Sequence, residues 1–174
     1  MTRVPSHDLT VCPLDPGHDR QGFTCGNARL DRYFKTQAGQ DARRRAAGVF
    51  VLVDPALPAE VLGYDTLAAL SLAQGDVPGA ARERLPRYPR VSATLIGRLA
   101  VAQVRQGRGL GAVLLLDAMR RAYASAATVG SSMIVVDAID ARAAAFYEAY
   151  GFLRLPEAER LVFPMHLVAQ LPAG

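Results

Sequence analysis

The 174-residue chain has little cysteine, no tryptophan and a single lysine, and these shortages exclude several classes of protein. With only Cys12 and Cys25, a disulfide scaffold is excluded, and no CxxC pair indicates a zinc site. No stretch approaches the roughly 18 consecutive apolar residues of a membrane-spanning helix. The first residues lack the charged head and apolar run of a signal peptide. We therefore expect a cytoplasmic protein that binds no metal and enters no membrane.

The scarcity of lysine leaves arginine to supply the positive charge. Lys35 and 19 arginines make up the 20 basic residues, against 16 acidic ones, for a net charge of +4 and a pI near 9.4. The planar guanidinium suits phosphate, so a phosphate-rich ligand or partner is one explanation. A GC-rich genome is another, because alanine and proline are also plentiful. The position of each arginine has to decide between them.

Composition and patterning predict one folded domain over residues 1–174. With 51% hydrophobic and 21% charged residues, the chain is not disordered, and its length suits a single core. Apolar periodicity and breaker residues predict strands and helices in mixed order. The expected elements are strand 8–14, a helix from an Asn27 cap to Gly48, strands 49–53 and 61–70, loop 74–90, strand 92–101, helix 109–127, strand 132–137, helix 141–150 capped by Asp140 and ended by Gly151, and final-strand candidates at 161–163 and 165–168.

The most informative segment is a glycine-rich turn, Gln106-Gly-Arg-Gly-Leu-Gly111, between a strand and a long helix. Glycines let the backbone bend tightly and approach a ligand closely. The first N–H groups of the helix have no acceptor within it, which favours an anion such as pyrophosphate. Arg108 adds a charged donor. A P-loop is excluded because no Lys-Ser/Thr pair follows, and the glycine spacing does not match the dinucleotide-binding fingerprint.

These residues resemble the Q/R-x-x-G-x-G/A motif of the GCN5-related N-acetyltransferases. The strand Leu95–Val101 and the segment Ala145–Phe152 extend the likeness. The resemblance implies an α/β (α+β) fold, with a mixed central sheet of about six to seven strands and about four flanking helices. It also implies acetyl-coenzyme A as cosubstrate. The residues that it assigns to the coenzyme are Leu99, Ala100 and Val101 on a bulged strand, and Gln106, Gly107, Arg108, Gly109, Leu110, Gly111 and Ala112 at the turn.

A narrower resemblance joins the chain to the acetyltransferase toxins of type II toxin–antitoxin modules. It rests on Phe23–Phe34, Gly63–Leu67, Leu85–Pro89, Gly97–Val101 and Asp137–Asp140. Members of that group acetylate the α-amine of aminoacyl-tRNA and so block translation. The resemblance implies a homodimer and a small ribbon-helix-helix antitoxin as partners. One departure is Ala102-Gln103, where the group customarily has an aspartate after Leu-Ala-Val.

Tyr147 is the expected catalytic residue. By resemblance, the tyrosine of the Phe-Tyr pair before Gly-Phe lies near the coenzyme sulfur, and a phenol with an ordinary pKa around 10 is protonated at neutral pH and can reprotonate a thiolate. A purely structural role in an aromatic core is the alternative for this side chain. Direct transfer needs no protein nucleophile, in agreement with two cysteines that have no His or Asp at a recognisable spacing. Tyr64 fits either an acceptor cleft or the core.

Two arginine groups are candidates for a tRNA surface: Arg43, Arg44 and Arg45, and Arg82, Arg84, Arg87 and Arg90. A solvated basic helix end and loop would give the same pattern. The predicted function is an acetyl-coenzyme A-dependent N-acetyltransferase of aminoacyl-tRNA. The alternatives are acetylation of a small-molecule or protein amine, and a non-catalytic regulator that binds coenzyme or nucleic acid.

Overall fold

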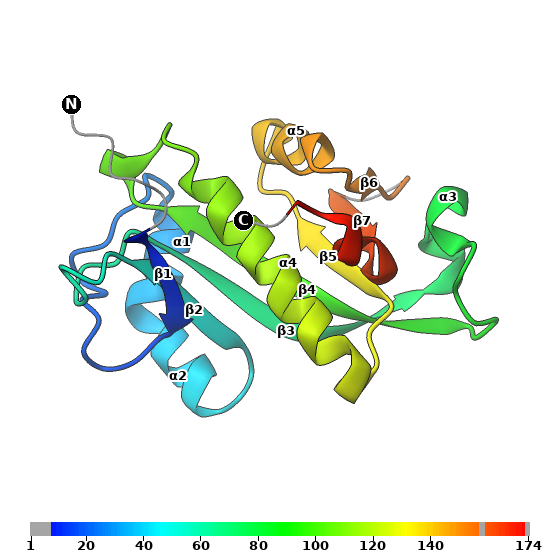
Figure 1. The fold of residues 1–174 in the computed structure, drawn as a ribbon, viewed down its shortest axis with the longest axis horizontal. Coiled ribbons are helices and arrows are strands. Elements are labelled where there is room, and N and C mark those ends of the chain that lie inside the picture. The colour runs from blue at the N-terminus through cyan, green and yellow to red at the C-terminus, as the bar shows by residue number, and fades with distance from the viewer. Residues whose placement is uncertain (1–7, 157–158, 173–174) are drawn as a thin grey trace. The chain divides into compact units, whose positions relative to one another are not determined.

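The computed structural model describes residues 8–156 and 159–172. Its strands form one mixed sheet in the order β1-β2-β3-β4-β5-β7-β6. β4 and β5 are parallel, whereas β1 with β2, β5 with β7 and β6 with β7 are antiparallel. The α/β fold class is confirmed. The elements are β1 Thr10–Pro13, α1 Ala28–Thr36, α2 Ala38–Arg43, β2 Gly48–Val53, β3 Gly63–Ala73, α3 Gly79–Arg82, β4 Arg90–Val101, α4 Leu110–Val129, β5 Met133–Asp137, α5 Ala141–Ala149, β6 Leu153–Arg154 and β7 Arg160–Pro164 (Figure 1).

The chain divides into two compact units. The first unit comprises the residues up to Thr66 together with Arg98–Asp117, and the second comprises Leu67–Gly97 together with the residues from Ala118 onward.

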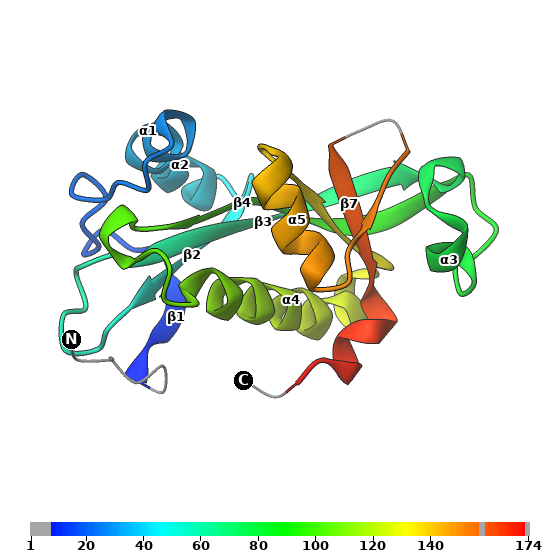
Figure 2. The ribbon, with the colours of Figure 1, turned by 90° about the horizontal axis from the view of Figure 1, so that it is seen from above.

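In the first unit, alternation along β2 divides the core into two clusters. Val49, Val51 and Val53 pack with the aromatic residues of α1, whereas Leu52 packs with the first turns of α4. The two-residue period of a strand explains the division, since successive side chains point to opposite faces. Figure 2 shows α1 and α2 on one side of β2 and the start of α4 on the other.

The helix predicted from Asn27 to Gly48 is two helices. Its start is confirmed, because the Asn27 side chain accepts hydrogen bonds from the N–H groups of residues 29 and 30. The helix breaks at Gln37, whose φ and ψ of −122° and −32° are not helical. It ends near Arg45, which has a left-handed φ of 57°, and Gly48 begins β2 instead of ending the helix. The apolar periodicity continues through the break, since Tyr33 and Phe34 before it and Ala38 after it are all buried.

The second unit has a core formed by residues of β3, β4, β5 and β7 together with the α3 segment. The Asp140 cap is confirmed, because its carboxylate accepts the Ala143 N–H at 2.7 Å. Gly151 follows α5 with a φ of +95°, also as predicted. Two expectations were wrong. The 74–90 loop contains helix α3, and residues 165–170 form a 3₁₀ turn where a strand was a candidate.

Candidate active site

The glycine-rich turn begins the long helix α4 of the first unit. Gly107 and Gly109 both have a φ of +79°, a left-handed conformation that side chains rarely adopt. A Cβ added to either glycine would meet no heavy atom within 4 Å among the neighbours that the structure describes. Backbone conformation therefore requires these glycines, and the space in front of them is open. The N–H of Val113 donates to the Gly109 carbonyl at 3.3 Å, which leaves the earlier N–H groups of the helix directed outward.

Gln106 attaches this turn to two other segments of the first unit. Its side-chain nitrogen donates to the Val101 carbonyl at 3.0 Å and to the Cys25 carbonyl at 2.8 Å. The sequence motif predicts that Gln106 binds the coenzyme but does not indicate these bonds, one of which joins residues 81 positions apart. The amide nitrogen of Gln106 thus holds the turn against the end of β4.

The predicted coenzyme-binding strand residues lie beside the turn in the same unit. Leu99 and Val101 pack against the cluster that contains Leu110 and Leu114, whereas Ala100 is buried on the face of α1. Gly63 was not predicted as a functional residue, yet neighbouring atoms lie so close to its backbone that a side chain would not fit. A Cβ there would lie 2.8 Å from the Ala100 carbonyl oxygen and 2.7 Å from Leu114 Cδ1. Arg108 is exposed, so its guanidinium is available to a ligand at the turn.

Tyr147 lies in α5, within the second unit. Its ring makes edge-on contact with Phe146 at 5.3 Å between centroids and a tilted contact with Phe152 at 5.6 Å. Tyr147 is 7% exposed, and Phe146 also contacts Tyr150, which lies four residues further along the helix. The Tyr147 ring is therefore packed among neighbouring aromatic residues. Its predicted catalytic role stays a prediction.

The predicted arginines differ in whether their side chains form hydrogen bonds within the protein. Arg43 ends α2, and Arg44 and Arg45 follow it, all exposed. In the second unit, Arg82, Arg84 and Arg87 are also exposed, but Arg90 donates to the Ser71 hydroxyl at 2.7 Å and to its carbonyl at 3.0 Å. Arg90 is thus engaged in holding β4 beside β3. Arg29 and Arg32 are further exposed basic residues on α1, which their three-residue spacing could have indicated.

The cysteines have polar neighbours that spacing did not reveal. Cys12 Sγ lies 3.7 Å from Nε2 of His18, whose Nδ1 accepts the Asp15 N–H at 3.0 Å. That bond leaves the ring proton on Nε2, so the neutral imidazole has no free nitrogen to take the thiol proton. Burial and the Asp15 charge raise the pKa of Cys12, and burial and Asp31 raise the pKa of Cys25 to about 11. Both cysteines are thiols at neutral pH.

Tyr64 belongs to the core and does not line a cleft. Its side chain is fully buried, and its hydroxyl donates to the Leu30 carbonyl at 2.7 Å. Its ring stacks on Phe34 with centroids 4.3 Å apart and meets the edge of Phe23 at 5.5 Å. Burial raises the pKa of Tyr64 far above its ordinary value. The phenol therefore stays protonated and has a structural role.

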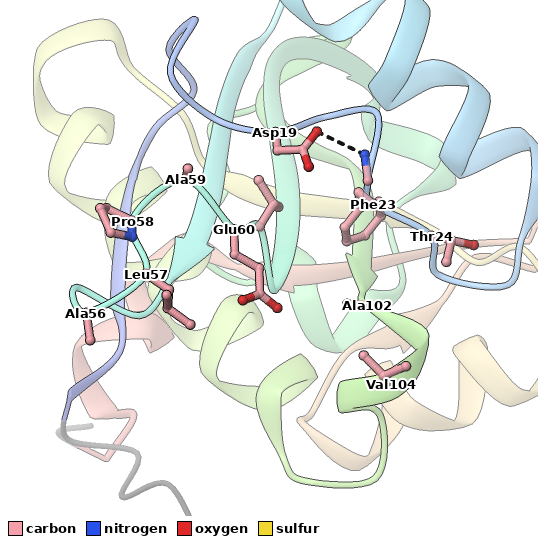
Figure 3. Close-up of a pocket in the computed structure, with 12 residues that line it drawn as sticks. Asp19, Phe23, Thr24, Ala56, Leu57, Pro58, Ala59, Glu60, Ala102 and Val104 are labelled. Carbon is pink, nitrogen blue, oxygen red and sulfur yellow. Dashed lines mark hydrogen bonds between the residues drawn. The ribbon is translucent and has the colours of Figure 1, made fainter.

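An open depression of about 510 Å³ lies beside the end of β4 in the first unit. Figure 3 shows the 56–60 segment on one side of it and Ala102 and Val104 on the other. Leu57 and Val104 are 56% and 77% exposed. The Asp19 carboxylate accepts a hydrogen bond from the Gly22 N–H at 3.0 Å, and the Glu60 carboxylate forms an ion pair with the Arg105 guanidinium at 3.5 Å. The depression therefore offers mainly apolar surface.

Residues 8–156 and 159–172 contain no group of three or more His, Cys, Asp or Glu side chains that could hold a metal ion. Across the same residues, each helix is either too short or too polar to span a bilayer.

Known proteins resemble this chain in sequence and in structure. The acetyltransferase (GNAT) family matches residues 67–152. A tRNA-acetylating toxin of Mycobacterium tuberculosis is 34% identical over 155 residues, which are 89% of this chain and 87% of the relative. The solved structure of AtaT complexed with acetyl-methionyl-tRNAfMet has a TM-score of 0.86 and 28% identity, over 94% of this chain and 98% of that one. A mutant AtaT toxin bound to the C-terminus of the antitoxin AtaR and acetyl-CoA has a TM-score of 0.79 and 26% identity, over 94% and 97%.

Proposed function

Because the chain belongs to the acetyltransferase (GNAT) family, we propose that it transfers the acetyl group of acetyl-CoA to the α-amine of aminoacyl-tRNA and so acts as a toxin that blocks translation. The observation that carries the proposal is the likeness, over most of both chains, to a toxin named for acetylating tRNA. The AtaT structure with acetyl-methionyl-tRNAfMet supports the same acceptor class.

Acetyl-CoA fits the glycine-rich turn of the first unit. The outward N–H groups of residues 107–112 bind the pyrophosphate, the open space at Gly107 and Gly109 admits it, and exposed Arg108 pairs with its charge. The backbone of Leu99, Ala100 and Val101 binds the pantetheine and the acetyl carbonyl. Gln106 keeps these two binding segments together, because it bonds the Val101 carbonyl from the turn.

The reaction is a direct transfer. The neutral α-amine attacks the thioester carbonyl, a C–N bond forms, and the C–S bond breaks. The Tyr147 hydroxyl gives a proton to the departing thiolate, the amine releases a proton to solvent, and solvent returns one to the Tyr147 phenolate. Backbone N–H groups near Val101 stabilise the oxyanion. The raised pKa values of Cys12 and Cys25 argue against a cysteine nucleophile.

The exposed arginines supply the tRNA contacts. Phosphate contacts of this kind give affinity that is independent of sequence and sensitive to salt. Arg43, Arg44 and Arg45 form one group, and Arg82, Arg84 and Arg87 form another. Arg90 contributes less than the other members, because its guanidinium already bonds to Ser71.

The proposed acceptor also sets the cellular context. We propose that the chain acts as one catalytic domain in the cytoplasm, where aminoacyl-tRNA is made. We expect a homodimer and a ribbon-helix-helix antitoxin as partners, and the AtaT complex with AtaR supports an antitoxin.

The deciding experiment offers labelled acetyl-CoA with a panel of charged tRNAs, the same tRNAs uncharged, polyamines and a lysine-rich protein. We expect label only on charged tRNA, recovered as an N-acetyl amino acid after mild base cleaves the ester. Label on a polyamine or a protein, and on no charged tRNA, would instead support the alternative of a small-molecule or protein acetyltransferase. Coenzyme binding without any transfer would support a regulator.

A further inference from the structure

Arg98 of β4 is stacked on an aromatic ring in the first unit. Its guanidinium carbon lies 3.4 Å from the centroid of Tyr33, a nearly buried residue of α1. A guanidinium held flat on a ring directs its N–H groups outward along its edge. Arg98 is partly exposed, so this edge is accessible from outside the protein.

The ring beneath Arg98 is held in place from several sides. The Tyr33 hydroxyl donates to Asp41 Oδ2 at 2.8 Å, and the Gln37 side chain donates to Asp41 Oδ1 at 2.9 Å. The ring stacks at 6.4 Å on Tyr64, which stacks in turn on Phe34. Tyr33 therefore forms a rigid platform, and little conformational freedom remains for the arginine stacked on it.

The protein leaves the donors of this arginine unused. Within residues 8–156 and 159–172, the Arg98 guanidinium makes no hydrogen bond and no ion pair within 4.0 Å. Asp41 is near enough for Arg98 to help lower its pKa, after the hydrogen bonds from Gln37 and Tyr33. Both carboxylate oxygens of Asp41 already accept those two bonds. A partly desolvated guanidinium with unused donors is suited to an oxyanion, which it can bind through two parallel hydrogen bonds.

The position of Arg98 relates this oxyanion to the proposed reaction. Alternation along β4 puts the side chains of Arg98 and Ala100 on the face toward α1, and those of Leu99 and Val101 on the other face. Arg98 thus directly precedes the segment proposed to hold the acetyl group. The α-carboxyl group of an aminoacyl-tRNA is esterified, so the acceptor carries no carboxylate there, but it carries one phosphodiester for each nucleotide.

We propose that Arg98, positioned by Tyr33, binds a phosphodiester oxygen near the 3′ end of the aminoacyl-tRNA. This inference rests on the proposed function. The same donors suit the carboxylate of a small acceptor, and the experiment below separates the two sources of oxyanion.

The test compares one amino acid on two acceptors, the charged tRNA and the 3′-aminoacyl ester of adenosine, which has no phosphodiester. For Arg98→Met, we expect kcat/KM to fall about tenfold on the tRNA, the size of a lost charge-assisted contact, and less than about twofold on the adenosine ester. Arg98→Lys keeps the positive charge and the aliphatic part of the side chain but lacks the planar guanidinium with its two parallel donors. Its loss of kcat/KM on tRNA should therefore be intermediate. Equal losses on both acceptors, or none on tRNA, would overturn the proposal.

Two controls separate this role from folding and from general charge. Arg105→Met removes an arginine that already pairs with Glu60 and should leave the ratio between the acceptors unchanged. Acetyl-CoA affinity should stay at the unsubstituted value in Arg98→Met, which shows that β4 is intact. If the unsubstituted protein acetylates no charged tRNA, the proposed function fails by itself. Arg98→Met is then assayed on the accepted amine as free acid and as amide, and a loss confined to the acid reassigns Arg98 to a carboxylate.

Discussion

The side-chain nitrogen of Gln106 lies 3.0 Å from the carbonyl oxygen of Val101 and donates a hydrogen bond to it. This contact fixes the glycine-rich turn against the end of β4. The glycine-rich turn is proposed to bind the pyrophosphate, and the end of β4 is proposed to bind the acetyl end of the coenzyme. The hydrogen bond thus sets the spacing between these two segments before any ligand binds.

Gln106→Glu should weaken acetyl-CoA binding. A carboxylate cannot donate to the Val101 and Cys25 carbonyls, and it places negative charge beside two acceptors. We expect the dissociation constant, measured by calorimetry, to rise about tenfold or more, with loss of roughly 1–3 kcal/mol of unfolding free energy. Gln103→Glu is the matched control, because the Gln103 side chain makes no hydrogen bond within the described residues. Similar affinities for the two variants would contradict the bridging role.

The glycines of the turn can be tested against a glycine with the same backbone. Gly109 has a φ of +79° and Gly130, at the end of α4, has +78°, and a Cβ meets no described neighbour at either. Alanine at either position should cost about 1–2 kcal/mol of stability. Only Gly109→Ala should also lose acetyl-CoA affinity, because its methyl group enters the space proposed for the pyrophosphate. An equal loss of affinity in Gly130→Ala would place the effect in folding.

Tyr147→Phe should lower turnover by about 10² to 10⁴ while acetyl-CoA still binds. The ring keeps its contacts with Phe146 and Phe152, so the fold should persist. Tyr150→Phe is the control, since Tyr150 contacts the same Phe146 and has no proposed part in proton transfer. A folded Tyr147→Phe protein with near-normal turnover would rule out the catalytic role.

Replacing Arg43, Arg44 and Arg45 together by alanine should weaken tRNA binding and reduce its salt dependence. The plot of log K against log salt has a negative slope, and each lost phosphate contact reduces the magnitude of that slope by about 0.7 to 0.9. Arg90→Ala should mainly lower the unfolding free energy, because Arg90 bonds Ser71. Filter binding over a salt series measures the slope. An unchanged slope in the triple variant would assign these arginines to composition bias.

Asp41 should make the stability of the first unit depend on pH. Hydrogen bonds donated by Gln37 and, to a smaller extent, by Tyr33 lower the pKa of Asp41, whereas its partial burial acts in the opposite direction. The Asp41 carboxylate therefore stabilises the folded state at pH values above its unfolded pKa of about 4. This stabilisation is lost as the pH falls through the lower pKa that Asp41 has in the folded protein. The difference in unfolding free energy between the unsubstituted protein and Asp41→Asn should be larger at pH 7 than at pH 3 in urea titrations. The same difference at both pH values would refute this.

Local signals in the sequence were enough for several parts of the fold and site. The Asn27 and Asp140 caps, the left-handed Gly151 and the turn at Gly107 and Gly109 each depend on bonds or dihedral angles within a few residues. Such features can be inferred from residue type and order alone. The break at Gln37 could not, because periodicity continues through it while the backbone does not.

The amino-acid sequence by itself determined the class of fold, the place of the glycine-rich turn before the long helix and, through its motifs, the family. Tertiary structure decided which side chains are engaged. Gln106 bonds Cys25, Arg98 stacks on Tyr33, and Tyr64 lies in the core. Arg90 is committed to Ser71, which separates it from its predicted group. These contacts join segments that the sheet and its helices bring together from distant positions, and no local pattern of hydrophobicity or charge records which partners meet.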